Sequence, residues 1–235
     1  MGVETRERAP LSREQVLQAG LRYVNAHGLD ALSMHKLGQA LGVAAMSLYK
    51  HVANKNDLLD GIVEQLWAEI PVEPASSDWR GAVSELASAL RDLVHRHPHA
   101  ASLLTSRRTV QERMLRVGDT LLRMMRQDGV PEQCAVGLLR TVIPYGIGFA
   151  LAELSFQDCM PATDNEVGRI RQVSAMLSPD ASDDLVRTAL LMCGDCDMNA
   201  QFDIGIQLMI AGLDACLANL PGRPCGFADR TVSCR

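Results

Sequence analysis

Aromatic residues are scarce in this sequence, and long apolar runs are missing. Only 4% of the 235 residues are Phe, Trp or Tyr although 47% are hydrophobic, so the core must be built from aliphatic and methionine side chains. No unbroken apolar run approaches the about 18–20 residues that span a bilayer, and the first ten residues lack the apolar segment of a signal peptide. These absences predict a cytoplasmic protein with no membrane partner.

Disulfide, nucleotide-binding and catalytic patterns are also lacking. The seven cysteines are an odd number without regular spacing, which is typical of reduced thiols rather than of a secreted disulfide framework. Gly146-Ile147-Gly148 has neither a preceding strand nor the third glycine of a dinucleotide loop, and no serine stands in a nucleophile elbow. The sequence therefore predicts no enzyme and no cofactor, with a helical enzyme or adaptor as the alternative class.

Charge is unevenly distributed along the chain. The net charge of −5 by itself argues weakly against a nucleic-acid partner. Residues 1–55, however, carry seven Lys/Arg against four Asp/Glu, whereas the remaining residues carry 16 against 24. The N-terminal part is therefore basic and the remainder acidic, and any proposed function has to account for this asymmetry of charge.

Helical periodicity runs through nearly the whole chain, and no alternating strand pattern is present. Capping patterns predict helices that begin after Ser12, Ser33 and Asn54, and Gly28 and Gly42 are suited to end the first two. The predicted fold class is all-α. Further helices are expected over 44–51, over about 78–97, within 98–106, and over about 109–127, 131–157 and 202–218, with 158–165 and 193–200 as loops around a weaker helical region.

The stretch LGVAAMSLYKHVANKNDLL, residues 41–59, has small side chains at the start of a short helix. Two short helices joined by a turn at Gly42 form a helix-turn-helix pattern, in which the start of the second helix lies against base edges. Small residues there let the backbone approach DNA, and Lys50, His51 and Lys55 stand where phosphates would lie. Spacing alone leaves open a second interpretation, a close packing contact inside a helical bundle.

The run G-V-x-x-x-S-L-Y-x-H-x-x-N-K-x-x-L-L over residues 42–59 resembles the DNA-binding domain of the TetR family of transcriptional repressors, and this resemblance covers about 11–67. The segments DWRGAVSELASALRDLVHRHPHAASLL, YGIGFALAEL and FDIGIQLMIAGLDACL resemble the tetracycline-repressor type of regulatory domain. The resemblance implies an N-terminal helix-turn-helix domain over 1–70, whose three-helix unit is completed by a fourth helix. It also implies a C-terminal helical ligand-binding and dimerisation domain over 78–220 and a tail over 221–235.

The function implied by this resemblance is a ligand-responsive repressor that binds palindromic double-stranded operator DNA as a homodimer and is released by a small molecule. His35 stands where tetracycline repressors have a guanine-reading arginine, Ala45 replaces a polar base reader, and Lys55 matches a phosphate-contacting lysine. These departures predict an operator different from the tetracycline operator. The expected DNA-binding residues are Ser33, His35, Ala45, Met46, Ser47, Tyr49, Lys50, His51 and Lys55.

The regulatory domain departs from the tetracycline repressors as well. Ile70 or Pro71 stands in place of a drug-binding histidine, and Leu103 in place of a histidine that ligates the drug-bound magnesium. Glu153 matches an acidic residue near that metal but does not hold the ion alone. The resemblance therefore predicts no metal site and a small, largely apolar effector. The expected contacts are the apolar and aromatic Leu86, Leu90, Leu103, Met114, Met125, Tyr145 and Phe149, with His99, Arg107 and Gln111 as polar anchors.

Dimerisation is expected through the helices near 136–156 and 202–218, which would form an intersubunit four-helix bundle. Four glycines would permit close approach and four apolar residues of the last helix would form the contact. The glycines are Gly146, Gly148, Gly205 and Gly212, and the apolar residues are Ile206, Met209, Ile210 and Leu213.

Two short motifs suggest metal or redox chemistry. Cys193 and Cys196 have the spacing of a zinc or redox pair, but no second ligand pair stands nearby in the sequence, so a reduced thiol pair is the competing interpretation. His95 and His99 are four residues apart, yet Pro98 between them interrupts the helix that would place them on one face. Neither motif changes the predicted function, and a thiol- or metal-sensing regulator stays open as an alternative class.

Overall fold

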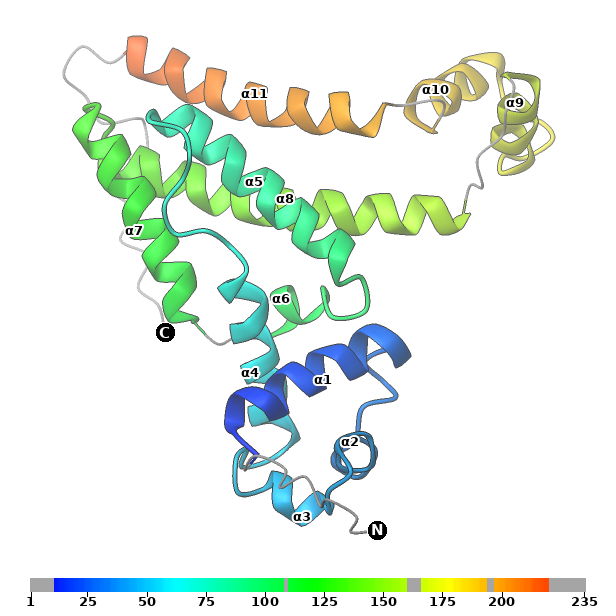
Figure 1. Ribbon diagram of the computed structural model, residues 1–235. Helices are drawn as coiled ribbons and strands as arrows, with labels where there is room; N and C mark the ends of the chain where they lie inside the picture. The colour runs from blue at the N-terminus through cyan, green and yellow to red at the C-terminus, as the bar shows by residue number, and fades with distance from the viewer. Residues whose placement is uncertain (1–10, 108–109, 160–165, 194–196, 220–235) are drawn as a thin grey trace, which may run out of the picture. The chain divides into compact units, whose positions relative to one another are not determined.

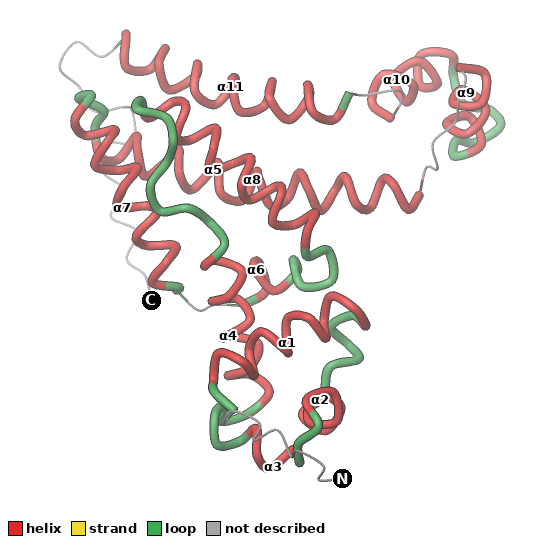
Figure 2. The backbone as a smooth tube through the Cα atoms, in the orientation of Figure 1, coloured by secondary structure: helices red, strands yellow, loops and turns green. Residues whose placement is uncertain are grey.

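The computed structural model describes residues 11–107, 110–159, 166–193 and 197–219, and within these residues every regular element is an α-helix (Figures 1 and 2). The predicted all-α fold class is confirmed. In chain order the helices are α1 (Arg13–His27), α2 (Met34–Leu41), α3 (Ala45–Leu48), α4 (Lys55–Ala68), α5 (Trp79–Arg96), α6 (Leu103–Ser106), α7 (Glu112–Gln127), α8 (Glu132–Cys159), α9 (Glu166–Ala175), α10 (Asp183–Cys193) and α11 (Met198–Ala218).

The chain folds into two compact units, each built from two separate stretches of sequence. The first unit joins the residues up to Ala75 with Asp92–Leu121, and the second joins Ser76–Arg91 with the residues from Leu122 onward. Helices α5 and α7 therefore each begin in one unit and end in the other. The expected limits of the DNA-binding domain at residue 70 and of the regulatory domain at residue 78 remain a prediction.

The three helix starts predicted from capping patterns are confirmed, together with the side chains that cap them. Ser12 and Gln15 form a reciprocal capping box: the Ser12 hydroxyl accepts from the Gln15 N–H at 3.2 Å, and the Gln15 side chain accepts from the Ser12 N–H at 2.9 Å. Ser33 and Asn54 each accept the N–H of the residue three positions on, at 3.2 and 3.0 Å. Local capping thus determines where α1, α2 and α4 begin.

The core formed by α1 to α4 in the first unit is mainly aliphatic, as the low aromatic content predicts. Helix α1 packs against α4 and α2, and α2 packs against α3. These contacts bury side chains from all four helices, which fixes α3 on a rigid support. The fully buried residues are Val16, Val24, Leu37, Leu48, Leu58, Ile62 and Leu66.

The turn between α2 and α3 is held by backbone groups. Gly42 has the left-handed conformation (φ 67°, ψ 33°), which glycine adopts without steric cost, and its N–H donates to the Gln39 carbonyl at 3.0 Å. A Cβ atom added to Gly38 would lie only 2.9 Å from the Val43 carbonyl oxygen and 3.1 Å from the Ala45 nitrogen. The two helices can meet this closely only because residue 38 has no side chain.

Helix α3 is shorter than the expected helix over 44–51. Ala44 precedes it without a side-chain cap, and residues 49–51 form a turn in which the N–H groups of His51 and Val52 both donate to the Leu48 carbonyl, at 2.9 and 3.0 Å. Two donors on one carbonyl end the regular α-helical ladder after a single turn.

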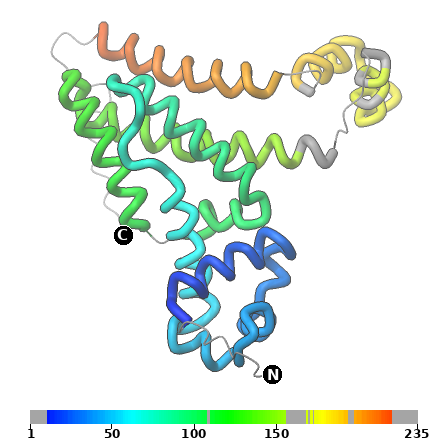
Figure 3. The backbone as a smooth tube through the Cα atoms, viewed as in Figure 1, coloured from blue at the N-terminus to red at the C-terminus, as the bar shows by residue number. Residues whose placement is uncertain are grey.

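In the second unit α8 and α11 lie along one another and run antiparallel (Figure 3). The Tyr145 hydroxyl of α8 donates to the Phe202 carbonyl of α11 at 3.0 Å, and the two rings stack with centroids 5.4 Å apart. Phe149 packs edge-on against Phe202 at 5.2 Å. Three of the few aromatic residues therefore join these two helices.

The region between α8 and α11 differs from the sequence prediction. Two helices, α9 and α10, pack against each other where one weaker helical region was expected. The expected loop over 193–200 is wrong at both ends, because Cys193 still belongs to α10 and α11 already begins at Met198. The reason is local: the Asp197 carboxylate caps the helix by accepting from the N–H groups of Asn199 and Ala200 at 3.0 and 3.1 Å. The expected loop over 158–165 and the tail over 221–235 lie largely or wholly outside the described residues.

Two described helices have the length and composition of membrane spans, over Glu132–Ser155 and Met198–Ala218, although neither is an unbroken apolar run. The buried core helices of other proteins have the same properties. Here α8 carries the buried, ion-paired Glu153, and α11 carries Asp214, which pairs with Arg80 of α5. Both helices thus use charged side chains to contact α5 within the protein.

Candidate DNA interface and regulatory residues

The predicted base-facing residues lie on the exposed side of α3 and the turn after it. Met46 is 74% exposed and Tyr49 44% exposed, whereas Leu48 between them is fully buried against the support. Ala45 and Ser47 are half-buried. Among the described residues up to Ala75, Met46 and Tyr49 are the exposed large apolar side chains, so both lie at the surface where the sequence predicts DNA contact.

The predicted phosphate-facing residues flank this surface. Lys50 and Lys55 are exposed, the first beyond α3 and the second at the start of α4. His35 is exposed in the first turn of α2, and its neighbour Ser33 uses its hydroxyl as the cap of that helix. His51 is half-buried, and its carbonyl is an acceptor within the unit. The structure brings the predicted set together on α2, α3 and the start of α4.

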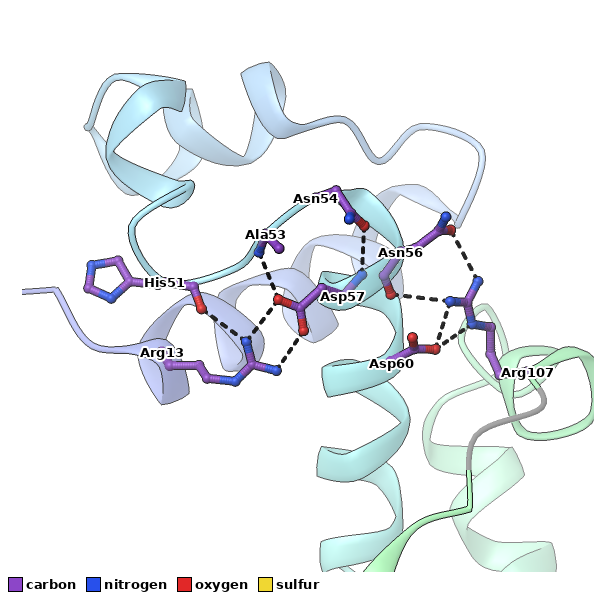
Figure 4. A network of polar contacts seen from close by, with 8 residues as sticks. All are labelled: Arg13, His51, Ala53, Asn54, Asn56, Asp57, Asp60 and Arg107. Carbon is purple, nitrogen blue, oxygen red and sulfur yellow. Dashed lines mark hydrogen bonds and ion pairs between the residues drawn. The ribbon is translucent and has the colours of Figure 1, made fainter.

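An ion pair that sequence reasoning missed joins α1 to the first turn of α4. The Arg13 guanidinium binds both carboxylate oxygens of Asp57, at 2.8 and 3.2 Å, and donates to the His51 carbonyl at 2.9 Å (Figure 4). Asp57 also accepts from the Ala53 N–H at 2.7 Å. Its hydrogen bonds to Arg13 and then to Ala53 hold the pKa of the Asp57 carboxyl below its usual range, and Asp57 raises the pKa of Arg13.

A second arginine binds the same end of α4. Arg107, which directly follows α6, donates from Nε to the Asp60 carboxylate at 2.7 Å (Figure 4). Its other nitrogens donate to the side-chain and backbone oxygens of Asn56, at 3.3 and 3.2 Å. All three guanidinium nitrogens of this residue, expected as an effector anchor, therefore contact α4.

A polar cluster around His97 joins the other end of α4 to α1 and α5. His97 lies just after α5, with Nε2 2.8 Å from the Glu69 carboxylate and Nδ1 2.8 Å from the Asn25 amide nitrogen. Because a carboxylate only accepts, Nε2 carries a proton. Arg96 also donates to Glu69, at 3.0 Å. The motif His95–His99 therefore contributes to packing through His97, while His99 is exposed.

The predicted effector contacts divide between the two compact units. In the first unit Leu103 is buried, whereas Gln111 and Met114 are half-buried. In the second unit Leu86, Leu90 and Met125 are buried, and the rings of Tyr145 and Phe149 lie 5.5 Å apart. Burial raises the pKa of the Tyr145 hydroxyl. The structure thus brings together Tyr145 and Phe149, beside Phe202, which sequence reasoning did not include.

Glu153, the residue that matches an acid near the drug-bound metal of tetracycline repressors, is paired within the protein. Its carboxylate is 4% exposed and binds Arg91 of α5 through both guanidinium branches, with Nε at 2.8 Å. The Arg91 guanidinium also lies over the Phe202 ring, 4.8 Å from its centroid. Among the residues that the structure describes, no group of three or more His, Cys, Asp or Glu could hold a metal ion. Cys193 ends α10, but Cys196 lies outside the described residues, so the thiol-pair hypothesis stays open.

Several residues expected in the dimer contact lie instead inside the second unit. A Cβ atom on Gly146 would lie 2.9 Å from the Ala87 carbonyl oxygen, and one on Gly205 would lie 2.0 Å from the Tyr145 hydroxyl. These glycines allow close packing of α8 on α5 and of α11 on α8. Ile206, Ile210 and Leu213 are buried as well, so the residue-level prediction of the dimer contact is wrong for them. The outward face of α11 carries Ile204 and Leu208, together with Gly212.

Comparison with known proteins bears out the expected family. Residues 70–217 match the family model "Tetracyclin repressor-like, C-terminal domain", which is more than half of the chain, and residues 16–62 match "Bacterial regulatory proteins, tetR family". The chain belongs to the TetR family. This TetR-family protein therefore combines a helix-turn-helix DNA-binding part with a regulatory part of the tetracycline-repressor type.

Three similar proteins illustrate the range of this TetR-family chain's relatives. The class A tetracycline repressor of Escherichia coli is 29% identical over 86% of this chain and 90% of its own length. The repressor DrrR1 of Streptomyces coeruleorubidus is 27% identical, and the match covers 63% of this chain but only 56% of that protein. The structure of ActR from Streptomyces coelicolor in complex with actinorhodin is similar with a TM-score of 0.72 and 25% identity, covering 88% of this chain and 97% of ActR.

Proposed function

We propose that this TetR-family protein is a cytoplasmic, ligand-responsive repressor that binds palindromic operator DNA as a homodimer and leaves it when a small, largely apolar effector binds. No catalytic role, membrane partner or metal cofactor is part of this proposal. The observation that carries the proposal is the exposed surface of Met46 and Tyr49, which a buried Leu48 holds on the helix-turn-helix unit.

The DNA-contacting residues follow from their position around that surface. Met46 and the methyl group of Ala45 suit contact with thymine methyl groups, and Ser47 can pair with several bases. The exposed Lys50 and Lys55 suit phosphates, which position the protein without reading sequence. His35 replaces the guanine-reading arginine of the tetracycline repressors, so the operator should differ from theirs.

The proposed chemistry of the effector follows from the residues that stand where tetracycline repressors bind the drug-bound magnesium. Leu103 stands where a magnesium ligand would be and is buried, and the carboxylate of Glu153 is occupied by Arg91. A drug–magnesium complex would have to break this partly buried ion pair, which is costly because it leaves a buried charge uncompensated. The ActR structure with actinorhodin gives a precedent for a relative that binds a compound other than tetracycline. We therefore propose an apolar or aromatic effector whose contacts in the second unit are Leu86, Leu90, Met125, Tyr145 and Phe149.

The homodimer is proposed to form through α8 and α11. Support comes from the outward face of α11, where Ile204 and Leu208 are exposed, whereas Phe202, Ile206, Ile210 and Leu213 of the same helix are buried. A dimer would cover these side chains and would present two recognition helices about 34 Å apart, as a palindromic operator requires.

The test begins with DNA duplexes that the wild-type protein selects from a random-sequence library. A symmetric consensus bound by two protomers is the expected result. Lys55→Ala should weaken binding to selected and unrelated duplexes by a similar factor. It should also reduce the slope of log affinity against log salt concentration by about one. Failure to select any consensus would contradict the proposal.

Effector release is then measured on the selected duplex with a panel of lipophilic and aromatic compounds, with and without magnesium. Release that is independent of magnesium and unchanged by EDTA and by reductant is expected. Release by a magnesium-chelated drug alone would instead favour the metal-dependent mechanism of tetracycline repressors, and release by oxidants alone would favour a thiol sensor built on Cys193 and Cys196.

A further inference from the structure

The first turn of α4 is contacted from two sides by arginines that come from distant parts of the sequence. Arg13 of α1 binds Asp57, and Arg107 binds Asp60 and Asn56 (Figure 4). Arg107 lies 47 residues beyond Asp60 and outside the segment 16–62 that matches the DNA-binding family model. A residue outside the DNA-binding segment thus contacts the turn that carries Lys55.

This turn is connected to the recognition surface by hydrogen bonds. Asp57 accepts from the Ala53 N–H and binds Arg13, and Arg13 in turn donates to the carbonyl of His51, just beyond Tyr49 and Lys50. Asn54 caps the same turn. Because these bonds join consecutive segments of backbone, the orientation of the first turn of α4 determines where Lys55 and the end of the recognition segment lie.

The chemistry of Arg107 suits it to orient this turn. A guanidinium is planar and places its N–H donors in fixed directions, so its bonds to Asp60 and to two oxygens of Asn56 restrict rotation of the turn about the helix axis. Its side chain is 22% exposed and that of Asp60 31% exposed. An ion pair of this exposure contributes little to overall stability. Its effect should therefore be on geometry.

We propose that Arg107 is a positioning residue for operator recognition: it holds the first turn of α4, and through it Lys55 and the recognition segment, in the DNA-binding orientation. This inference rests on the proposed function, since it concerns binding to an operator. It also removes Arg107 from the expected effector anchors, because its donors are directed to α4.

The test compares Arg107→Gln, Asp60→Asn and the double variant, using the duplex that the wild-type protein selects from a random library and an unrelated duplex of equal length. Arg107→Gln should weaken binding to the selected duplex about tenfold, within the usual range of about 5–150-fold for coupling between sites. Binding to the unrelated duplex should weaken less, because the two duplexes share the Lys55 phosphate contact but not the base contacts, and the melting temperature should change little. The double variant should bind no more weakly than the weaker single variant, because both substitutions remove the same contact.

Arg116→Gln is the matched control. Arg116 lies in the same segment and pairs with Glu112, with both side chains largely exposed, so its loss should leave selected-duplex binding unchanged. Arg107→Lys keeps the charge without the planar donors and should restore at most part of the affinity. Amide hydrogen exchange of residues 53–60 provides an independent measurement, and exchange there should be faster in Arg107→Gln than in Arg116→Gln.

Three results would overturn the inference. The first is wild-type affinity for the selected duplex in Arg107→Gln, and the second is an equal loss of affinity on both duplexes, which would indicate a general loss of structure. The third is unchanged exchange over residues 53–60. If the wild-type protein selects no duplex at all, the proposed function fails and this inference fails with it, whereas normal selection with an unaffected variant contradicts the inference alone.

Discussion

At the scale of single residues, Gly38 shows how one missing side chain permits the DNA-reading turn. A Cβ atom there would meet the Val43 carbonyl oxygen at 2.9 Å and the Ala45 nitrogen at 3.1 Å, and backbone atoms cannot rotate away as a side chain can. Gly38→Ala should therefore destabilise the protein by about 1–3 kcal/mol, the usual range for overpacking. It should also weaken operator binding, because α3 would shift. Urea denaturation and binding to a selected duplex measure the two effects.

Gly118→Ala in α7 is the control for this substitution. An added Cβ at Gly118 has no heavy atom within 4 Å, and alanine is a better helix former than glycine. This variant should be more stable than the wild type by up to about 1 kcal/mol. Equal stability of Gly38→Ala and the wild type would show that the turn can relax, contrary to the role given to Gly38.

At the scale of secondary-structure elements, the Arg13–Asp57 pair couples α1 to α4 in a pH-dependent way. The pKa of Asp57 is lowered in the folded protein, so the pair contributes stability that is fully present above the unfolded pKa and is lost as pH falls through the folded pKa. The window therefore begins near pH 4, at the ordinary aspartate pKa of about 3.9, and extends downward. Because both side chains are partly exposed, the contribution should be below about 1 kcal/mol.

Asp57→Asn should reduce stability at pH 6 and make its fall below pH 4 shallower than in the wild type. Denaturant midpoints measured between pH 3 and 7 check this expectation. Arg13→Gln serves as the companion variant, since removing either partner should flatten the same part of the profile. Profiles that remain parallel to the wild type would mean that the pair does not contribute to pH-dependent stability.

At the scale of the whole molecule, the outward face of α11 is the element that the proposed dimer needs. Leu208 is 68% exposed, although the neighbouring Ile206 and Ile210 are buried. Leu208→Glu would place a charge in the proposed contact and should convert the dimer to a monomer at micromolar concentration, as measured by analytical ultracentrifugation. Operator affinity should fall with it, because a monomer reads one half-site only.

Leu115→Glu in α7 is the matched control for Leu208→Glu, since it changes another exposed leucine outside α8 and α11. It should sediment like the wild type. A wild-type protein that is monomeric at micromolar concentration, or a Leu208→Glu variant that remains a dimer, would contradict the assignment of the interface to α11.

The sequence by itself determined the features that depend on interactions between residues close together in the chain. The capping side chains of Ser12, Ser33 and Asn54, the left-handed Gly42 and the apolar periodicity act within about four residues, so the all-α fold and most helix starts could be predicted. The same local pattern around Gly42–Leu59 was distinctive enough to indicate the TetR family, which the comparisons confirm.

Only the tertiary structure decided which distant side chains meet. Arg107 and Asp60 are 47 residues apart, Arg91 and Glu153 are 62 apart, and Arg80 and Asp214 are 134 apart. It also decided which glycines face inward. Gly146 and Gly205, expected at the dimer contact, pack against other residues of the second unit. Helical periodicity identifies an apolar face but does not specify whether the same chain or a second copy covers it, because burial stabilises either arrangement in the same way.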